Sequence, residues 1–204
     1  MSDQLWDEME ELERKGKAFW QGDRWIVNKL MTYLNHKAIY EVVQGAKLGQ
    51  DYFTSVAATI KEPAVWYTPL YNFPVLQPAV KDTRTSVKTP FGMLQLFTET
   101  PTFAAGKQRQ GIAPNIIHSL DAELLRFVVE NFEGDIGTVH DCFLVHPNEG
   151  EQVRNLYKEG YIALMSTNPM EYIGRQIDKE GKIEVPCIGT LNLEEVKDSM
   201  YIIS

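Results

Sequence analysis

The sequence has 204 residues with 28 acidic and 20 basic side chains, so its formal net charge is −8. An acidic balance argues against a free-standing nucleic-acid-binding protein, which usually carries a basic excess. The apolar fraction of 44% is ordinary for a globular protein. The sequence contains no run of 18 or more apolar residues, so we expect no membrane span.

The cysteine content and the N-terminus also limit the classes of protein. Cys142 and Cys187 are too few for a disulfide framework, and their separation does not match a zinc site. Residues 1–13 hold six acids and no base, which is the opposite of a secretory or transit signal. We therefore expect a cytoplasmic protein with no membrane contact, folded as one domain or two closely packed lobes.

The first quarter of the chain predicts three helices. Leu5, Trp6, Met9 and Leu12 recur at helical spacing behind Ser2 or Asp3 as a possible cap. Helical periodicity continues over 25–44, with Gly45 suited to the C-terminal cap, and again over 50–60. We expect these helices to be scaffold rather than site.

Residues 61–101 change to strand-type sequence. Runs over 83–87 and 93–97 flank the turn-forming tetrapeptide Thr89-Pro90-Phe91-Gly92, which predicts an extended β-hairpin. Residues 81–109 carry five bases against two acids. A charge run of this kind is usually a solvated face, but it also permits a nucleic-acid-facing surface on an acidic body.

The strongest helical pattern covers residues 115–132, with Pro114 just ahead of it. His118 and Asp121 are three residues apart and so lie on neighbouring positions of one face. Taken alone, a histidine on a helix is more often a structural hydrogen-bonding residue than a functional one. Farther along we expect helices over 148–165, from Pro169 behind an Asn168 cap, and over 191–204.

Asp141 lies between two short apolar runs of the segment 136–147. These runs, bounded by Gly137 and Pro147, predict two short strands with Asp141 at or beside the bend. Asp141 can be an ordinary turn residue, since Asp favours turns. Within an apolar frame, an ionised carboxylate is costly without a compensating cation, and Mg²⁺ is the alternative that this cost favours.

Several ordered blocks resemble the single-subunit RNA polymerases of bacteriophages and mitochondria. The resemblance runs from about residue 25 to residue 204. It rests on GIAPNIIHSLDA at 111–122, VHDCF at 139–143, WYTP at 66–69 with FPV at 73–75, and GTLNL at 189–193.

The resemblance implies a role for each matched residue. Asp141 corresponds to the second metal-binding carboxylate of a two-Mg²⁺ site, His140 orients its hairpin, and Cys142 packs. His118, in the PN-x-x-HS motif that begins at Pro114-Asn115, corresponds to a contact with the nascent base pair. The extended hairpin corresponds to a promoter-recognition loop, with Lys81, Arg84 and Lys88 as possible DNA contacts. Tyr201 belongs to a C-terminal tail that packs near the catalytic centre.

The implied fold class is α+β, the late fingers and palm of a right-hand polymerase, mostly helical with a palm hairpin and a long specificity-type hairpin. We expect an acidic helical extension over 1–24, a fingers-like segment over 25–113 with its hairpin at about 75–100, and a palm-like segment over 114–204. The palm-like segment contains the hairpin 136–147 and the C-terminal tail.

Two family motifs are missing from this sequence: the Asp-Gly stretch with the first metal-binding Asp, and the fingers motif with its Arg, Lys and Tyr. We therefore expect one subunit of a split RNA polymerase. A second subunit would supply these motifs, and DNA template, nascent RNA and nucleoside triphosphates would be its other partners. The alternatives are a truncated, non-catalytic paralogue that binds a polymerase or nucleic acid and, ranked third, a related DNA polymerase, a class that usually has Glu where Cys142 stands.

Overall fold

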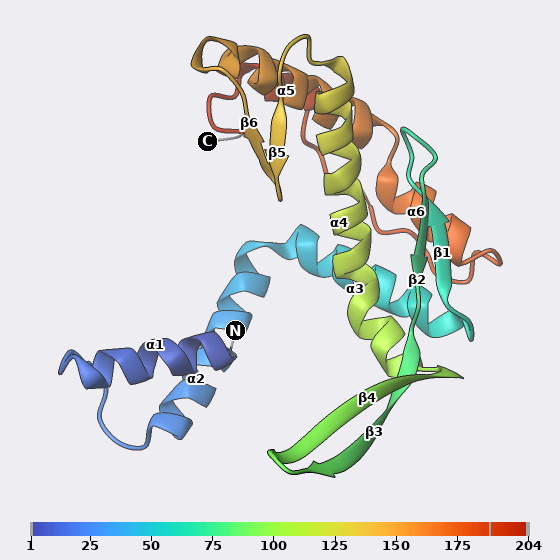
Figure 1. Ribbon diagram of the computed structural model, residues 1–204. Helices are drawn as coiled ribbons and strands as arrows, with labels where there is room; N and C mark the ends of the chain where they lie inside the picture. Colours follow the sequence, from blue (N-terminus) through green and yellow to red (C-terminus); the bar gives the residue numbers. More distant parts are fainter. Residues whose placement is uncertain (1, 188, 203–204) are drawn as a thin grey trace. The chain divides into compact units, whose positions relative to one another are not determined.

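A computed structural model describes residues 2–187 and 189–202 (Figure 1). The chain divides into two compact units, residues 1–48 and 49–204, and the boundary falls within one helix. Helices and small antiparallel strand pairs make up the described elements, which confirms the expected α+β class.

The first unit is built from α1 (Ser2–Arg14) and α2 (Arg24–Val42). The two helices pack together through Arg24, whose guanidinium lies 4.2 Å from the centre of the Trp6 ring and 2.9 Å from a carboxylate oxygen of Glu13. Met9 and Asn28 are buried in this unit. α1 begins at Ser2, so Asp3 lies in its first turn rather than capping it.

The boundary predicted at Gly45 is wrong. α2 ends at Val42 with Val43 as its cap, and α3 (Gln44–Thr59) begins directly afterwards with Gly45 in its first turn. The amide N–H of Val43 donates to the carbonyl oxygen of Ile39, so no glycine is needed to end α2. α3 therefore starts six residues earlier than the apolar spacing predicts.

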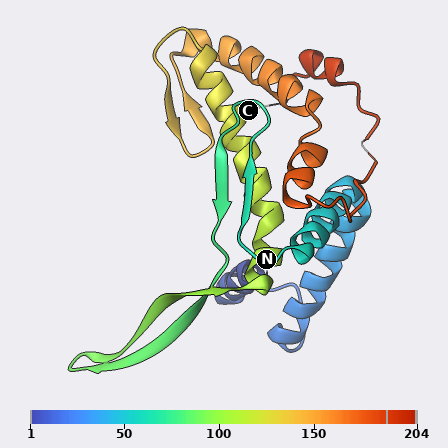
Figure 2. The same ribbon diagram turned by 90° about the vertical axis from the view of Figure 1, so that its right-hand side faces the viewer.

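The core of the second unit forms where α3 meets α4 (Ala105–Asn131), α5 (Gly150–Ser166) and α6 (Pro169–Ile177). Strand β1 (Ala64–Tyr67) adds the fully buried Trp66 and pairs antiparallel with β2 (Pro74–Gln77). Figures 1 and 2 show this strand pair lying alongside α4. Burial of these apolar side chains holds the helices together. The other fully or nearly fully buried members include Val56, Ile112, Ile116, Leu164 and Ile173.

The expected extended hairpin is present as β3 (Val80–Thr89) and β4 (Gly92–Phe103), paired antiparallel from Val80–Phe103 to Thr89–Gly92. The hydroxyl of Thr89 donates to the carbonyl oxygen of Gly92 at 2.8 Å and closes the turn. We call this hairpin the ribbon. It extends away from the first turns of α4 (Figure 2). Most of its side chains are exposed.

The helix predicted to begin after Pro114 instead begins at Ala105, with Pro114 in its interior. Proline inside a helix removes one backbone hydrogen bond and crowds the preceding turn. Ile112 and Ile116, on either side of Pro114, are both fully buried in the core. Their packing keeps the helix continuous, so tertiary contacts override the local signal. The domain boundary expected between residues 113 and 114 falls inside this helix.

The last part of the chain contains β5 (Gly137–Val139), β6 (Cys142–Leu144), the 3₁₀ turn η1 (Pro147–Glu149), α5, α6 and the 3₁₀ helix η2 (Leu193–Asp198). Asn168 caps α6 through an acceptor bond from the amide of Glu171, with Pro169 at its first position, as predicted. The prediction of a final helix over 191–204 is wrong for the described residues, where only η2 forms. Residues 203–204 lie outside the described part. No described helix has the length and apolar character needed to cross a membrane.

Candidate functional site

Asp141 occupies the two-residue turn between β5 and β6, as the sequence predicts. Val139 pairs with Cys142, which leaves His140 and Asp141 as the turn residues. His140 has a φ of 56°, in the left-handed region that residues with a side chain seldom adopt. Its backbone therefore makes the bend that places Asp141.

The apolar frame expected around Asp141 is absent, because the Asp141 side chain is exposed. The carboxylate is thus open to solvent and to ligands. Cys142 is exposed as well, so the expectation that it packs is wrong. Its thiol donates to a carboxylate oxygen of Asp141 at 3.8 Å.

A small apolar cluster holds the β5–β6 hairpin against α4 and α5. Phe143 packs against Val128 of α4, against Phe132 at the C-terminal end of α4, and against Val153 of α5. The Phe143 ring also meets the ring of Tyr157 edge-on, with centroids 6.4 Å apart. The turn is therefore supported by α4 and α5, which limits the motion of the Asp141 backbone.

Asp121 of α4 shares the neighbourhood of Asp141. Burial raises the pKa of the Asp121 carboxyl, the charge of Asp141 raises it further, and His118 lowers it. The pKa of the Tyr157 phenol is also raised, first by burial and then by Asp121, Tyr161 and Asp141. His118, Asp121, Asp141 and Tyr157 thus form one electrostatic group, which we call the acidic site.

The acidic site contains two carboxylates from different elements, Asp121 of α4 and Asp141 of the β5–β6 turn, whose charges act on each other. In the described part of the chain, no group of three or more His, Cys, Asp or Glu side chains is placed to hold a metal ion. Sequence reasoning missed Asp121 as a neighbour of Asp141. The spacing His118-x-x-Asp121 was visible, but the approach of the hairpin to α4 is a tertiary relationship.

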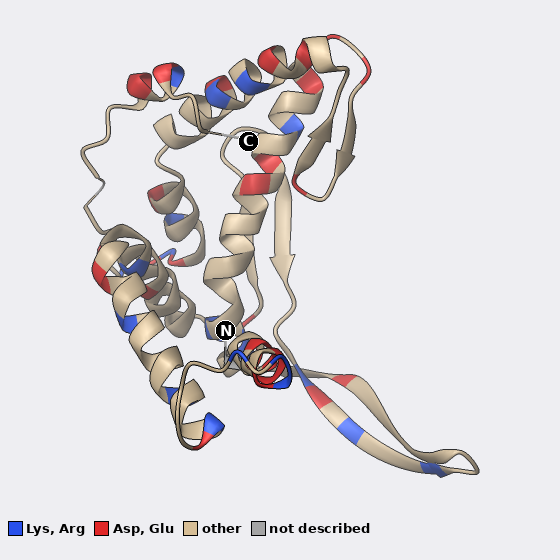
Figure 3. Cartoon of the chain, turned by 90° about the vertical axis from the view of Figure 1, so that its left-hand side faces the viewer, with Lys and Arg blue, Asp and Glu red and all other residues tan. Residues whose placement is uncertain are grey.

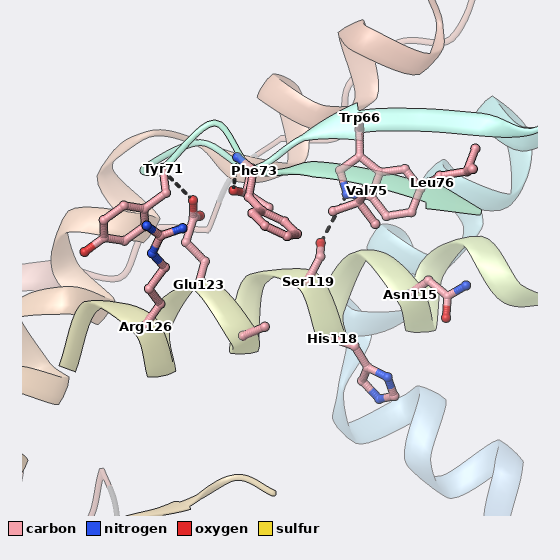
Figure 4. Close-up of a pocket in the computed structure, with 12 residues that line it drawn as sticks. Trp66, Tyr71, Phe73, Val75, Leu76, Asn115, His118, Ser119, Glu123 and Arg126 are labelled. Atoms are coloured by element: carbon pink, nitrogen blue, oxygen red, sulfur yellow. Dashed lines mark hydrogen bonds between the residues drawn. The ribbon is translucent and has the colours of Figure 1, made fainter. Parts of the chain in front are cut away.

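A pocket of about 520 Å³ lies between α4 and the β1–β2 strand pair (Figure 4). Asn115 and His118 are exposed at one end, so His118 belongs both to the lining of this pocket and to the acidic site. Apolar and aromatic side chains form half of the lining. The apolar and aromatic members are Trp66, Tyr71, Phe73, Val75, Leu76 and Ala122.

Buried polar contacts shape the pocket wall. The indole N–H of Trp66 donates to the Ser119 hydroxyl oxygen at 3.1 Å. One carboxylate oxygen of Glu123 accepts the amide N–H groups of Leu70 and Tyr71 at 2.9 and 2.7 Å. Together these bonds fix the loop between β1 and β2 on α4 (Figure 4).

The other predicted contact residues lie apart from the acidic site. Lys81, Arg84 and Lys88 are exposed along β3, where Figure 3 shows basic positions spaced along the ribbon. Figure 1 shows the ribbon near the first turns of α4 and the β5–β6 hairpin near its other end. The Tyr201 side chain is 86% exposed, and its amide donates to Ser199.

A family model described as DNA-dependent RNA polymerase matches residues 1–187. The chain is 30% identical over 175 residues to DNA-directed RNA polymerase 1, mitochondrial, of Arabidopsis thaliana, covering 81% of this chain and 18% of that protein. It is 28% identical over 170 residues to DNA-directed RNA polymerase 3B, chloroplastic, of Nicotiana tabacum, covering 80% of this chain and 17% of that protein.

The matched chain therefore spans less than a fifth of the length of these two relatives. A third relative, DNA-directed RNA polymerase 1A of Nicotiana tabacum, is 28% identical over 153 residues, which cover 72% of this chain and 98% of that sequence. The family match extends over most of the chain and includes α4 and the β5–β6 hairpin. The chain belongs to the phage-type, single-subunit family of DNA-dependent RNA polymerases.

Proposed function

We propose that this chain contributes Asp141 as one metal-binding carboxylate of a DNA-directed RNA polymerase that acts only as part of a larger complex. The observation that carries the proposal is the exposed Asp141 carboxylate on a supported two-residue turn, within the electrostatic range of Asp121. The reaction is template-directed nucleotidyl transfer from nucleoside triphosphates to the 3′ end of RNA.

The donor chemistry at the acidic site fits part of a magnesium site. Mg²⁺ prefers oxygen ligands and commonly takes only one or two protein carboxylates, with substrate phosphates and water completing its shell. The exposed Asp141 is such a donor. The chemistry supplied by bound Mg²⁺ is activation of the 3′ hydroxyl and neutralisation of the pyrophosphate leaving group.

The role of these residues is to position the metal ion and the substrates, not to react with them. His140 sets the bend that aims Asp141, and the Phe143 cluster keeps the turn in place. His118, which belongs to the acidic site and lines the pocket, contacts the nascent base pair, and Asn115 at the same end of the pocket supports it. Tyr201 belongs to a tail that supports the same centre when the complex is complete.

We assign DNA contact to the ribbon. A two-stranded antiparallel ribbon is narrow enough to enter the major groove. Lys81, Arg84 and Lys88 place three positive charges on β3, and all three side chains are exposed. Arg84 also stacks over the Phe97 ring at 5.1 Å, which steadies its guanidinium on the ribbon surface.

A second polypeptide supplies the missing motifs: the first metal-binding Asp and the Arg, Lys and Tyr of the fingers motif. The test is reconstitution of RNA synthesis with a polypeptide from the same genome that carries these motifs, DNA template, nucleoside triphosphates and Mg²⁺. We expect no synthesis from either chain alone and synthesis from the pair. Template-directed synthesis by this chain alone would refute the split arrangement.

A non-catalytic regulator is the second candidate. The observation that favours it is the small donor set: residues 2–187 and 189–202 provide no group of three or more potential metal ligands. A regulator would bind a complete polymerase of the same genome and change its activity. Its function would survive Asp141→Asn, whereas the function of a catalytic subunit would not.

A further inference from the structure

One face of α2 carries a contiguous row of exposed apolar side chains. Ile26, Leu30, Tyr33 and Leu34 are 59, 55, 63 and 48% exposed. Ile26, Leu30 and Leu34 recur every four residues, and Tyr33 lies next to them on the same side of the helix. We call these four residues the α2 stripe. Single exposed apolar residues are ordinary, but a contiguous set marks an interaction surface.

The neighbouring helix of the same unit uses a different face of α2. Asn28 is buried there, and Arg24 contacts Trp6 and Glu13 of α1. At 100° per residue, Asn28 lies about 160° around the helix from Ile26. α1 therefore packs on the side of α2 that is nearly opposite to the start of the stripe, and it leaves the stripe uncovered.

We propose that the α2 stripe is the docking surface for an amphipathic helix of the second polymerase polypeptide. The inference rests on the proposed function, which requires that polypeptide. The length of two relatives supports this occupant: more than four fifths of each of them lies outside the part that this chain matches.

The spacing of the stripe indicates that the occupant is a helix. Side chains at every fourth position form a ridge, and such ridges fit the grooves of another helix in the commonest class of helix packing. A helix laid in this way buries apolar side chains at positions i, i+4 and i+7. Ile26, Leu30 and Tyr33 have this spacing.

The charges of α2 add a preference for the sequence of the docking helix. Lys29 and Lys37 lie close to the stripe, and Glu41 is the single acidic residue of α2. Glu41 lies 3.9 Å from the Lys37 ammonium, and both side chains are exposed. We therefore expect acidic residues beside the apolar face of the docking helix, since opposite charges at an interface favour the correct partner and its register.

The experiment compares two double variants on α2. Ile26→Gln with Leu30→Gln changes the stripe, and Ile39→Gln with Val42→Gln changes exposed apolar residues on a different side of the helix. The probe is the purified polypeptide that carries the first metal-binding Asp and the fingers motif, titrated into this chain by calorimetry. We expect the stripe variant to weaken binding at least tenfold, because two aliphatic side chains lose their apolar environment. The control variant should bind as the wild type does.

Measurements on the chain alone identify the other occupants. If another part of this chain covers the stripe in solution, the stripe variant will lower the unfolding temperature of the isolated chain and the control will not. If a second copy covers it, the wild-type chain will sediment as a dimer and the stripe variant as a monomer. Either result overturns the proposal, as does equal binding of both double variants or failure of the wild-type chain to bind the probe.

The results also separate this inference from the proposed function. A complex that forms through the stripe but makes no RNA contradicts the proposed function and leaves the docking surface standing. RNA synthesis that the stripe variant supports with unchanged affinity for the second polypeptide contradicts the docking surface alone.

Discussion

The indole N–H of Trp66 donates to the hydroxyl oxygen of Ser119 at 3.1 Å, which ties strand β1 to helix α4 inside the core. Trp66 is fully buried, and the Ser119 hydroxyl donates a hydrogen bond to the carbonyl oxygen of Ile116. This bond fixes the floor of the pocket beside His118. The pocket therefore depends on a polar contact as well as on apolar packing.

Ser119→Ala should destabilise the chain by about 1–3 kcal/mol, because it leaves the buried indole N–H without its acceptor. Thermal or urea unfolding measures the change. The matched control is Ser166→Ala, which removes an exposed hydroxyl that bonds within α5. Equal effects of the two substitutions would show that the Trp66 bond has no special weight.

Glu123 should fix the loop between β1 and β2 through its two backbone bonds. Glu123→Ala removes the acceptor for Leu70 and Tyr71, and hydrogen bonds to a charged group are worth about 1.5–3 kcal/mol each. Glu123→Gln retains an acceptor oxygen and should lose less. Hydrogen exchange at the amides of Leu70 and Tyr71 measures the loop directly, and unchanged exchange in Glu123→Ala would contradict this role.

The stability of the chain should fall at alkaline pH because of Tyr52. Burial raises the pKa of this phenol above its usual value near 10, and the charge of Asp178 raises it further. In the unfolded chain the phenol loses its proton at a lower pH, so the stabilising effect is complete below pH 10 and is lost as the pH rises through the folded pKa. Tyr52→Phe should flatten this decline. Parallel unfolding curves for the two proteins above pH 10 would contradict the assignment.

The ribbon should provide salt-dependent DNA affinity in the complete complex. Replacing Lys81, Arg84 and Lys88 by Ala removes up to three phosphate neutralisations, so the slope of log affinity against log salt should decrease by up to about 3. The control is the triple Ala variant of Lys17, Lys61 and Lys179, which are exposed elsewhere. A slope that changes equally in both triple variants would remove the ribbon from the DNA interface.

The local signals predicted two of the strand pairs, β3–β4 and β5–β6, but not the β1–β2 pair, whose strand β2 overlaps the start of the range of about 75–100 expected for the ribbon. Gly137 and Pro147 bound the segment that forms β5 and β6, and Thr89 to Gly92 supply the turn of the ribbon, so turn chemistry and strand propensity agree with the fold there. The same kind of signal failed at Pro114. Core packing of Ile112 and Ile116 holds that helix together across the proline, and local sequence carries no information about such packing.

The sequence carried less information about tertiary contacts and about which apolar side chains stay exposed. Helical periodicity identified α2 but could not show that Ile26, Leu30 and Tyr33 stay exposed, because an apolar stripe has the same pattern whether its partner is in the chain or outside it. The approach of Asp121 to Asp141 likewise joins residues 20 positions apart on different elements. Motif resemblance singled out Asp141 and His118 as candidates, whereas the electrostatic link of Asp121 to Asp141 is visible only in the fold.

The most direct test of the account is RNA synthesis by the reconstituted complex containing Asp141→Asn, compared with the complex containing Asp135→Asn, which changes an exposed acid just before the same hairpin. Loss of one metal-binding carboxylate should reduce template-directed synthesis by at least 100-fold, on the order of a few kcal/mol of transition-state stabilisation. Asp135→Asn should remain near wild type. Full synthesis by the Asp141→Asn complex would contradict the central claim that this chain supplies a catalytic carboxylate.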